Sequence, residues 1–87
     1  MNVYSGAKVF ELKATHGIPF DITFGRLINA GIAIDWVDFI ETARTNKWCD
    51  FQTYDAIRVG LFDACIDIHI ITNILNRVKL YIMSNLL

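Results

Sequence analysis

The chain has little excess charge of either sign, few cysteines and only one proline. Its 87 residues include 8 Lys and Arg against 9 Asp and Glu, which gives a formal charge of −1. Bulk charge therefore does not steer it towards nucleic acid or an anionic membrane surface. The two cysteines, Cys49 and Cys65, lack CxxC spacing and are too few for a disulfide framework. We interpret them as reduced thiols, which predicts a cytoplasmic protein.

Catalytic and metal-binding motifs are also missing. The two histidines, His16 and His69, have no second ligand at HxxxH or HExxH spacing. We interpret His16 as a side chain that complements the dipole at a helix C-terminus. The sequence has no GxSxG elbow and no glycine-rich phosphate loop. We therefore expect no metal, no cofactor and no catalytic activity.

Long uninterrupted apolar runs are absent as well. The most apolar region, residues 54–87, carries charged side chains at short intervals. It lacks the ~20 consecutive apolar residues that a membrane span requires. The first residues show no basic stretch followed by an apolar core, so we expect no signal peptide.

The chain is rich in hydrophobic residues. They make up 54% of the sequence, compared with ~45–50% in typical soluble domains. A chain of this length has a large surface for its volume and cannot bury all of them. We predict a single domain, residues 1–87, with an apolar surface that is covered in a homo-oligomer (dimer or higher) or by a partner.

Local signals predict three short helices in the first half of the chain. Ser5 is a suitable N-cap for a helix over residues 6–16, and Gly17 is placed where a left-handed residue ends a helix. Pro19 suits the first turn of a second helix, residues 19–30.

The third helix begins after a short turn. Gly31 ends the second helix, and Asp35 is a candidate N-cap for the third. Apolar residues from Trp36 to Ala43 recur on one face at helical spacing. The pattern breaks at residues 45–52.

From Tyr54 onward the spacing of apolar residues predicts one long helix. The repeat alternates between three and four residues for about four heptads, as in helices that pair along a seam. About 30 residues would extend ~45 Å, too long for a compact chain of this size. Such a helix either breaks, at Gly60 or within residues 69–73, or protrudes and pairs with another copy. The predicted interface consists of Ile57, Leu61, Ile68, Ile71, Leu75, Val78 and Ile82.

Two features of this region leave alternatives open. Asp67 and His69 alternate with isoleucines, which also fits a strand of period two. The three-four spacing on both sides favours the helix. Asp63 and Asp67 lie four residues apart. They belong either to a solvated face or, together with Asn73 and Arg77, to a polar strip that fixes the register of a partner.

Aromatic and basic residues gather where the third helix ends. Such interleaving either stacks bases and contacts phosphates, or forms a corner of the core with solvated flanks. The cluster comprises Arg44, Lys47, Trp48, Phe51 and Tyr54.

Residues 9–43 contain ten residues in a distinctive spacing. They are Phe10, Leu12, Thr15, Gly17, Pro19, Asp21, Ile22, Thr23, Asp35 and Phe39. In this spacing the run resembles the F-x-L-x-x-T-x-G-x-P-x-D-[LI]-T segment of the alanyl-tRNA synthetases and the D-x-x-x-F that follows it. In that family the segment belongs to the helical region that reads the acceptor stem of the tRNA.

The resemblance implies contact with a tRNA acceptor stem. The catalytic sheet and the zinc set of the editing domain have no counterpart here, so it implies neither aminoacylation nor editing. Asp21 matches the acidic residue that reads the wobble pair, where a carboxylate accepts a hydrogen bond from the guanine amino group. Lys13, Ala14, His16 and Ile18 depart from the family's usual residues. The implied RNA-binding residues are Lys13, Thr15, His16 and Asp21.

The sequence therefore predicts an all-α fold, a small helical domain of three short helices and one long apolar C-terminal helix, and supports two functions. The first is a non-catalytic binding protein, of the kind encoded by phages or mobile elements, that binds tRNA or a component of the host translation or defence machinery. The second is a protein-only interaction module, such as a viral inhibitor, that sequesters a partner through its long helix as a homo-oligomer. A purely architectural explanation of the corner at residues 15–23 favours the second function, because Gly17 and Pro19 would suit any tight helix–turn–helix.

Overall fold

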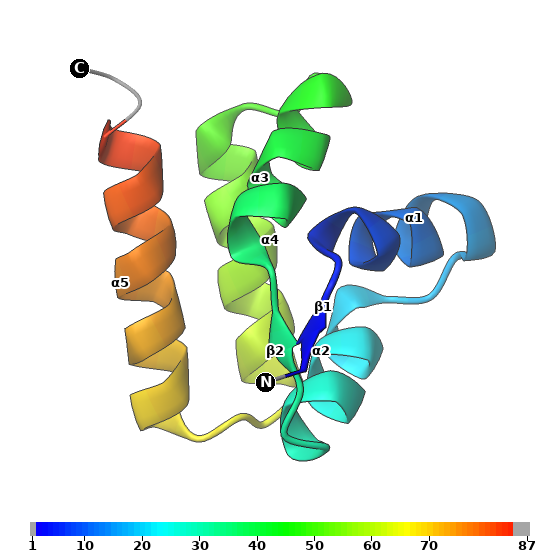
Figure 1. Ribbon diagram of the computed structural model, residues 1–87, viewed down its shortest axis with the longest axis vertical. Coiled ribbons are helices and arrows are strands. Elements are labelled where there is room, and N and C mark those ends of the chain that lie inside the picture. Colours follow the sequence, from blue (N-terminus) through cyan, green and yellow to red (C-terminus); the bar gives the residue numbers. More distant parts are fainter. Residues whose placement is uncertain (1, 85–87) are drawn as a thin grey trace.

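In the computed structural model, which describes residues 2–84, the chain forms five helices and one pair of very short strands (Figure 1). In chain order these are β1 (Val3–Tyr4), α1 (Gly6–His16), α2 (Phe20–Asn29), β2 (Ala33–Ile34), α3 (Trp36–Thr45), α4 (Asp50–Asp63) and α5 (Ile68–Ser84). The body they form has a Cα radius of gyration of 12.0 Å. The prediction of a mostly helical chain is confirmed.

The ends of α1 follow from its capping residues. The Ser5 hydroxyl accepts a hydrogen bond from the Lys8 amide at 3.3 Å, which satisfies one of the unpaired donors of the first turn. Gly17 ends the helix with φ of 68°, a conformation that costs glycine no steric strain. The predicted bounds of this helix are confirmed.

The next two helices begin within one residue of the predicted positions. Pro19 directly precedes α2, and the Asp35 carboxylate accepts a hydrogen bond from the Asp38 amide at 3.0 Å at the start of α3. Lys47 takes a positive φ of 66° just after α3, within the segment where the apolar pattern breaks. These local signals fix the order and length of the first three helices.

Aromatic side chains of α1, α2 and α3 form the centre of the core. Phe24 and Phe39 have no exposed surface. The Phe39 ring meets those of Phe10, Phe20 and Phe24 edge-on, with centroids 5.2–6.1 Å apart. The ring centroids of Trp48 and Phe10 lie 5.0 Å apart. Trp48, a member of the predicted aromatic and basic cluster, therefore belongs to a corner of the core.

A pair of very short strands accompanies the predicted helices and was not predicted. β1 and β2 are parallel, with Tyr4 opposite Ile34. The amide of Ala33 donates to the carbonyl of Asn2 at 3.1 Å, and the amide of Asp35 donates to that of Tyr4 at 2.9 Å. Strands of two residues, far apart in the sequence, leave no periodic pattern by which they could be predicted.

The structure does not confirm a single long C-terminal helix. Residues 64–67 separate α4 from α5, and α5 returns antiparallel beside α4 (Figure 1). Cys65 takes a positive φ of 58° at the break. The Asp67 carboxylate then accepts a hydrogen bond from the His69 amide at 2.8 Å, which caps the start of α5. The break falls between Gly60 and residues 69–73, the two predicted weak points.

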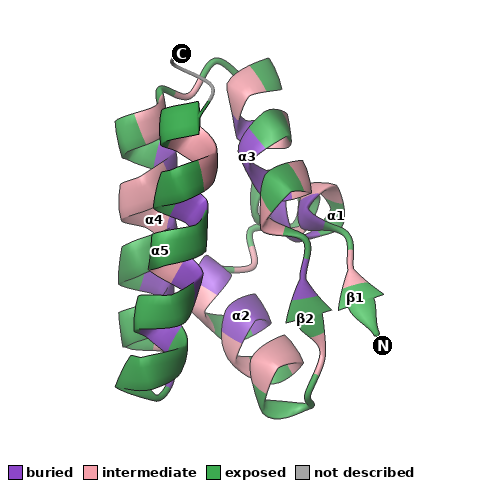
Figure 2. Ribbon diagram, turned by 60° about the vertical axis from the view of Figure 1, so that its left-hand side comes forward, coloured by how far each residue is buried: buried purple, intermediate pink, exposed green. Residues whose placement is uncertain are grey.

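Most residues predicted as an interface between copies lie in the chain's own core. Because α5 folds back along α4, the seam closes within one chain, and the buried faces of both helices turn inwards (Figure 2). Four of these side chains are buried, namely Ile57, Leu61, Ile71 and Val78. Leu75 and Ile82 are partly buried against the same core, and Ile68 is exposed.

Candidate functional site

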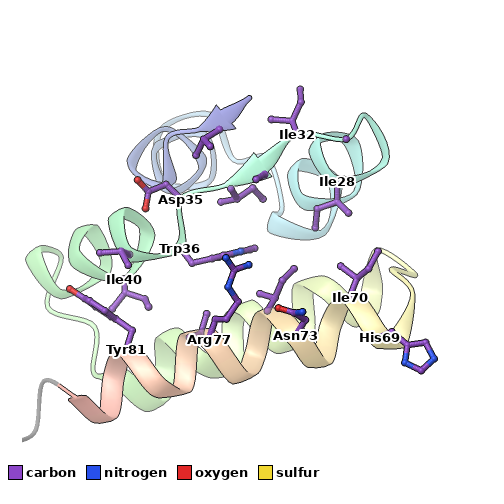
Figure 3. A pocket seen from close by; sticks show the side chains of 17 residues that line it. Ile28, Ile32, Asp35, Trp36, Ile40, His69, Ile70, Asn73, Arg77 and Tyr81 are labelled. Carbon is purple, nitrogen blue, oxygen red and sulfur yellow. The ribbon is translucent and has the colours of Figure 1, made fainter. Parts of the chain in front are cut away.

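A groove of about 820 Å³ lies between α5 on one side and β2, α3 and the end of α2 on the other (Figure 3). Buried aliphatic side chains line its depth, namely Ile34, Ile40, Ile74 and Val78. Val3, Val37 and Ile70 line it while remaining 57%, 45% and 43% exposed. The apolar lining therefore continues from the depth of the groove to its rim, where polar side chains such as Asp35, Asn73 and Arg77 adjoin it.

The groove forms because α5 is attached along one side only. Its main contact is with α4, and its contact with α3 is smaller. β2 is held on the opposite side by α2, where the Ile32 amide donates to the Leu27 carbonyl at 2.9 Å, and by its pairing with β1. The two walls belong to segments about 40 residues apart in the chain.

Four of the α5 side chains that line the groove follow one another at intervals of three, four and four residues. These residues, here called the α5 row, are Ile70, Asn73, Arg77 and Tyr81. Figure 3 shows them along the side of α5 that faces the groove, with His69 lining its end at the start of the helix. Such spacing places them on one face of the helix. No carboxylate of residues 2–84 forms an ion pair with Arg77.

A polar network closes one end of the groove. The Tyr81 hydroxyl donates to the Glu41 carboxylate. Arg44 donates to Glu41 at 2.9 Å and to both oxygens of Asp50 at 2.9 and 3.1 Å. The hydrogen bonds with Asp50 raise the pKa of Arg44, and those from Arg44 lower the pKa of Asp50. The network joins α3, α4 and α5, and it occupies Arg44, a predicted phosphate contact, with carboxylates.

The Asp38 carboxylate holds α1 against α3, which forms part of the groove wall opposite α5. Asp38 accepts hydrogen bonds from the Ala7 amide and the Ser5 hydroxyl, each at 2.8 Å. The Ala7 hydrogen bond, followed by that of Ser5, lowers the pKa of Asp38. At Gly6 the backbones approach so closely that a Cβ atom would lie 2.2 Å from the Phe39 nitrogen. The start of α1 therefore holds the first turn of α3, which contributes to the groove wall, in place.

Two of the four implied RNA-binding residues meet in a smaller pocket of about 510 Å³. Lys13 and Asp21 line it together with Trp48 and with Phe51, which is 78% exposed. The Lys13 ammonium lies 6.0 Å from the centre of the Phe20 ring, which also lines the pocket. The other two implied residues, Thr15 and His16, are exposed at the end of α1 and do not line this pocket.

The smaller pocket is more acidic than the sequence suggested. Asp55 and Asp63 of α4 line it in addition to Asp21. Asp55 forms an ion pair with Arg58 at 2.7 Å. Arg58 does not line the pocket, and Lys13 is the one cation of residues 2–84 that does. This charge distribution is less favourable to phosphate than the predicted cluster of aromatic and basic residues.

The polar strip predicted for the C-terminal half is divided by the break between the helices. Asp63 ends α4, whereas Asp67 caps α5. Asn73 and Arg77, the other half of the strip, lie in the α5 row. Sequence reasoning missed the opposite wall, because no local signal connects Ile32 and Val37 with α5.

The described residues show neither a membrane-spanning helix nor a metal cluster. Within residues 2–84 no helix is long and apolar enough to cross a membrane. No group of three or more metal-ligating side chains lies close together in the same part of the chain. No protein-family model, curated protein or solved structure matches the chain.

Proposed function

We propose that the protein is a non-catalytic interaction module that binds a segment of a protein partner in the groove between α3 and α5. The observation that carries this proposal is a buried aliphatic lining that continues into exposed apolar side chains and is flanked by polar ones, Asn73 and Arg77. Apolar surfaces rimmed by polar residues are typical of interaction sites, because covering them removes apolar area from water.

The dimensions of the groove suit a helix. Ile70 and Tyr81 are eleven positions apart on α5, which corresponds to ~16 Å, or about three helical turns. Helices that bind in grooves present anchors at intervals of three and four residues. The guanidinium of Arg77, which has no carboxylate partner within residues 2–84, supplies a single polar contact that would orient such a helix.

A pair of matched substitutions tests this function. Val37→Asp places a charge on the groove rim, and Met83→Asp places the same charge outside the groove at a site of similar exposure, 53% against 45%. We expect capture of the partner from the native host to fall at least tenfold for Val37→Asp and to be unchanged for Met83→Asp, because a charge is costly to bury against apolar side chains. Equal capture by both variants would contradict the proposal, provided that circular dichroism shows both to be folded.

Reading of a tRNA acceptor stem is the second candidate function, and the position of Asp21 supports it. Asp21 lies in the first turn of α2, directly after the turn at Gly17 and Pro19. Lys13 lines the same pocket, and the exposed ring of Phe51 offers a surface on which a base could stack.

A gel shift with alanine tRNA tests the second candidate. We expect Asp21→Ala to weaken binding at least fivefold and Glu11→Ala, at an exposed site of α1, to leave it unchanged. With one cation in the pocket, log Kd should change with log salt concentration by a slope of only about 1–2. The absence of a shift at micromolar protein would rule this candidate out.

A further inference from the structure

The groove has a matching surface on the outer side of α4. Four residues of α4, here called the α4 stripe, lie on one face at intervals of four, four and three: Phe51, Asp55, Val59 and Phe62. The three apolar members are 78%, 40% and 47% exposed. Ile57 and Leu61, on the opposite face of α4, are fully buried in the core. The stripe therefore lies on the solvent side of α4, where Phe51, Asp55 and Val59 also border the smaller pocket.

We propose that the groove of one chain receives the α4 stripe of a second copy. This inference rests on the proposed function and names the partner segment of the same groove. The exposed stripe explains why a helix that already buries one apolar face carries a second one. It also accounts for a hydrophobic content, 54%, that one small chain does not bury.

The spacing of the two rows agrees along their whole length. The α5 row advances by three, four and four residues from Ile70 to Tyr81, and the α4 stripe advances by the same steps when followed backwards from Phe62 to Phe51. Both rows span eleven positions, or ~16 Å. An antiparallel approach of the two helices therefore brings every member of one row opposite a member of the other.

This register pairs the charges. With Phe62 opposite Ile70 and Phe51 opposite Tyr81, Val59 meets Asn73 and Asp55 meets Arg77. Arg77 has no carboxylate partner within residues 2–84. Asp55 is held by Arg58 through a single oxygen at 2.7 Å, which leaves its second oxygen available to Arg77. In the reversed direction Asp55 would meet Asn73 and Val59 would meet Arg77, so only the antiparallel approach pairs the two charges.

The contact is heterologous, because the stripe and the groove are different surfaces. Each chain keeps a free groove at one end of a pair and a free stripe at the other, so assembly continues into a ring or an open chain. An interface of this small size corresponds to a Kd of about 1–100 µM. Self-association should therefore rise over that range of protein concentration.

Mixing two complementary variants tests the contact. Val37→Asp damages the groove and keeps the stripe, whereas Phe51→Asp with Phe62→Asp damages the stripe and keeps the groove. In sedimentation velocity each variant alone should be monomeric, and their mixture should form a 1:1 dimer and nothing larger. Leu80→Asp, at an exposed site outside both surfaces, should associate like the wild type. A mixture that stays monomeric while the wild type associates would overturn the contact.

A charge exchange tests the register. Arg77→Asp or Asp55→Arg alone should weaken self-association at least fivefold, and the two together should restore it, because the pair is then reversed across the same contact. Failure of the double variant to recover would overturn the antiparallel register. If the wild type stays monomeric at 1 mM, the second copy is not the occupant of the groove. The proposed function, binding of a partner segment in the groove, is then tested separately by the capture experiment with Val37→Asp.

Discussion

The core formed by α1, α2 and α3 is aromatic, whereas the side chains that attach α5 are aliphatic. Rings from α1, α2 and α3 interlock around Phe39, and hydrogen bonds to Asp38 fix α1 against α3. α5 is buried through three aliphatic residues, Ile71, Ile74 and Val78. The aromatic part is held by rings from three helices, whereas the attachment of α5 along α4 leaves the larger groove beside it.

This difference indicates how a small chain divides its apolar residues between stability and binding. Aromatic rings bury a large area each, so a few of them complete a core. Once α1 to α3 form that core, α5 needs only one face for its attachment, and its next face lines the groove.

Removal of the central ring should have the largest effect. Phe39→Ala takes away a fully buried ring and should lower the free energy of unfolding by about 3–5 kcal/mol, compared with about 2–3 kcal/mol for Ile71→Ala in α5. Urea denaturation followed by circular dichroism measures both values. Equal losses would show that the two regions do not differ in the way described.

A methyl group at Gly6 should separate α1 from α3. Its Cβ would lie 2.2 Å from the Phe39 nitrogen and 2.3 Å from the Asp35 oxygen, and backbone atoms cannot move aside as a flexible side chain does. We expect Gly6→Ala to cost about 3 kcal/mol. Gly25→Ala is the matched control, because its Cβ would make an ordinary contact at 3.5 Å and should stabilise α2 by up to ~1 kcal/mol. Similar melting temperatures for the two variants would refute this close approach.

The hydrogen bonds of Asp38 should make part of the stability depend on pH. The pKa of Asp38 is lower in the folded protein than its ordinary value of 3.8, so its contribution is complete above that value and is lost as the pH falls through the folded pKa. We expect Asp38→Asn to cost about 1–2 kcal/mol at pH 7. The difference from the wild type should shrink below about pH 4. A difference that stays constant down to pH 2 would exclude this role for the carboxylate.

Relief of strain between α4 and α5 should have the smallest effect. Cys65 has a φ of 58°, which costs a side chain ~1–2 kcal/mol but costs glycine little. Cys65→Gly also makes the unfolded chain more flexible, so we expect a net gain of only about 0.5 kcal/mol. Ala64→Gly, at a φ of −76°, should be destabilising instead. A loss with both variants would show that Cys65 contributes contacts that outweigh its strain.

The N-terminal helices could be predicted because their signals are local. Ser5, Gly17 and Asp35 act through hydrogen bonds or dihedral angles within a few residues of themselves. The division of the C-terminal half could not be predicted in the same way. A heptad seam has the same spacing whether it pairs with another copy or folds back on itself, and the turn at Cys65 contains no glycine or proline.

The same distinction applies to the two pockets. Lys13 and Asp21 flank one corner of the chain, so their presence in a common pocket agrees with the sequence. The larger groove depends on how β2 and α3 lie relative to α5, which tertiary packing decides. The sequence identified Asn73 and Arg77 as a polar strip but did not indicate the apolar wall that faces them.

The position of Trp36 has a practical consequence for spectroscopy. Its indole lies in the wall of the groove, edge-on to Phe24 with centroids 5.1 Å apart. The other tryptophan of the chain, Trp48, lines the smaller pocket. Trp48→Phe would leave one emitter whose fluorescence shifts to the blue when a ligand displaces water from the groove. The unlabelled protein thus carries its own optical reporter for each of the two surfaces.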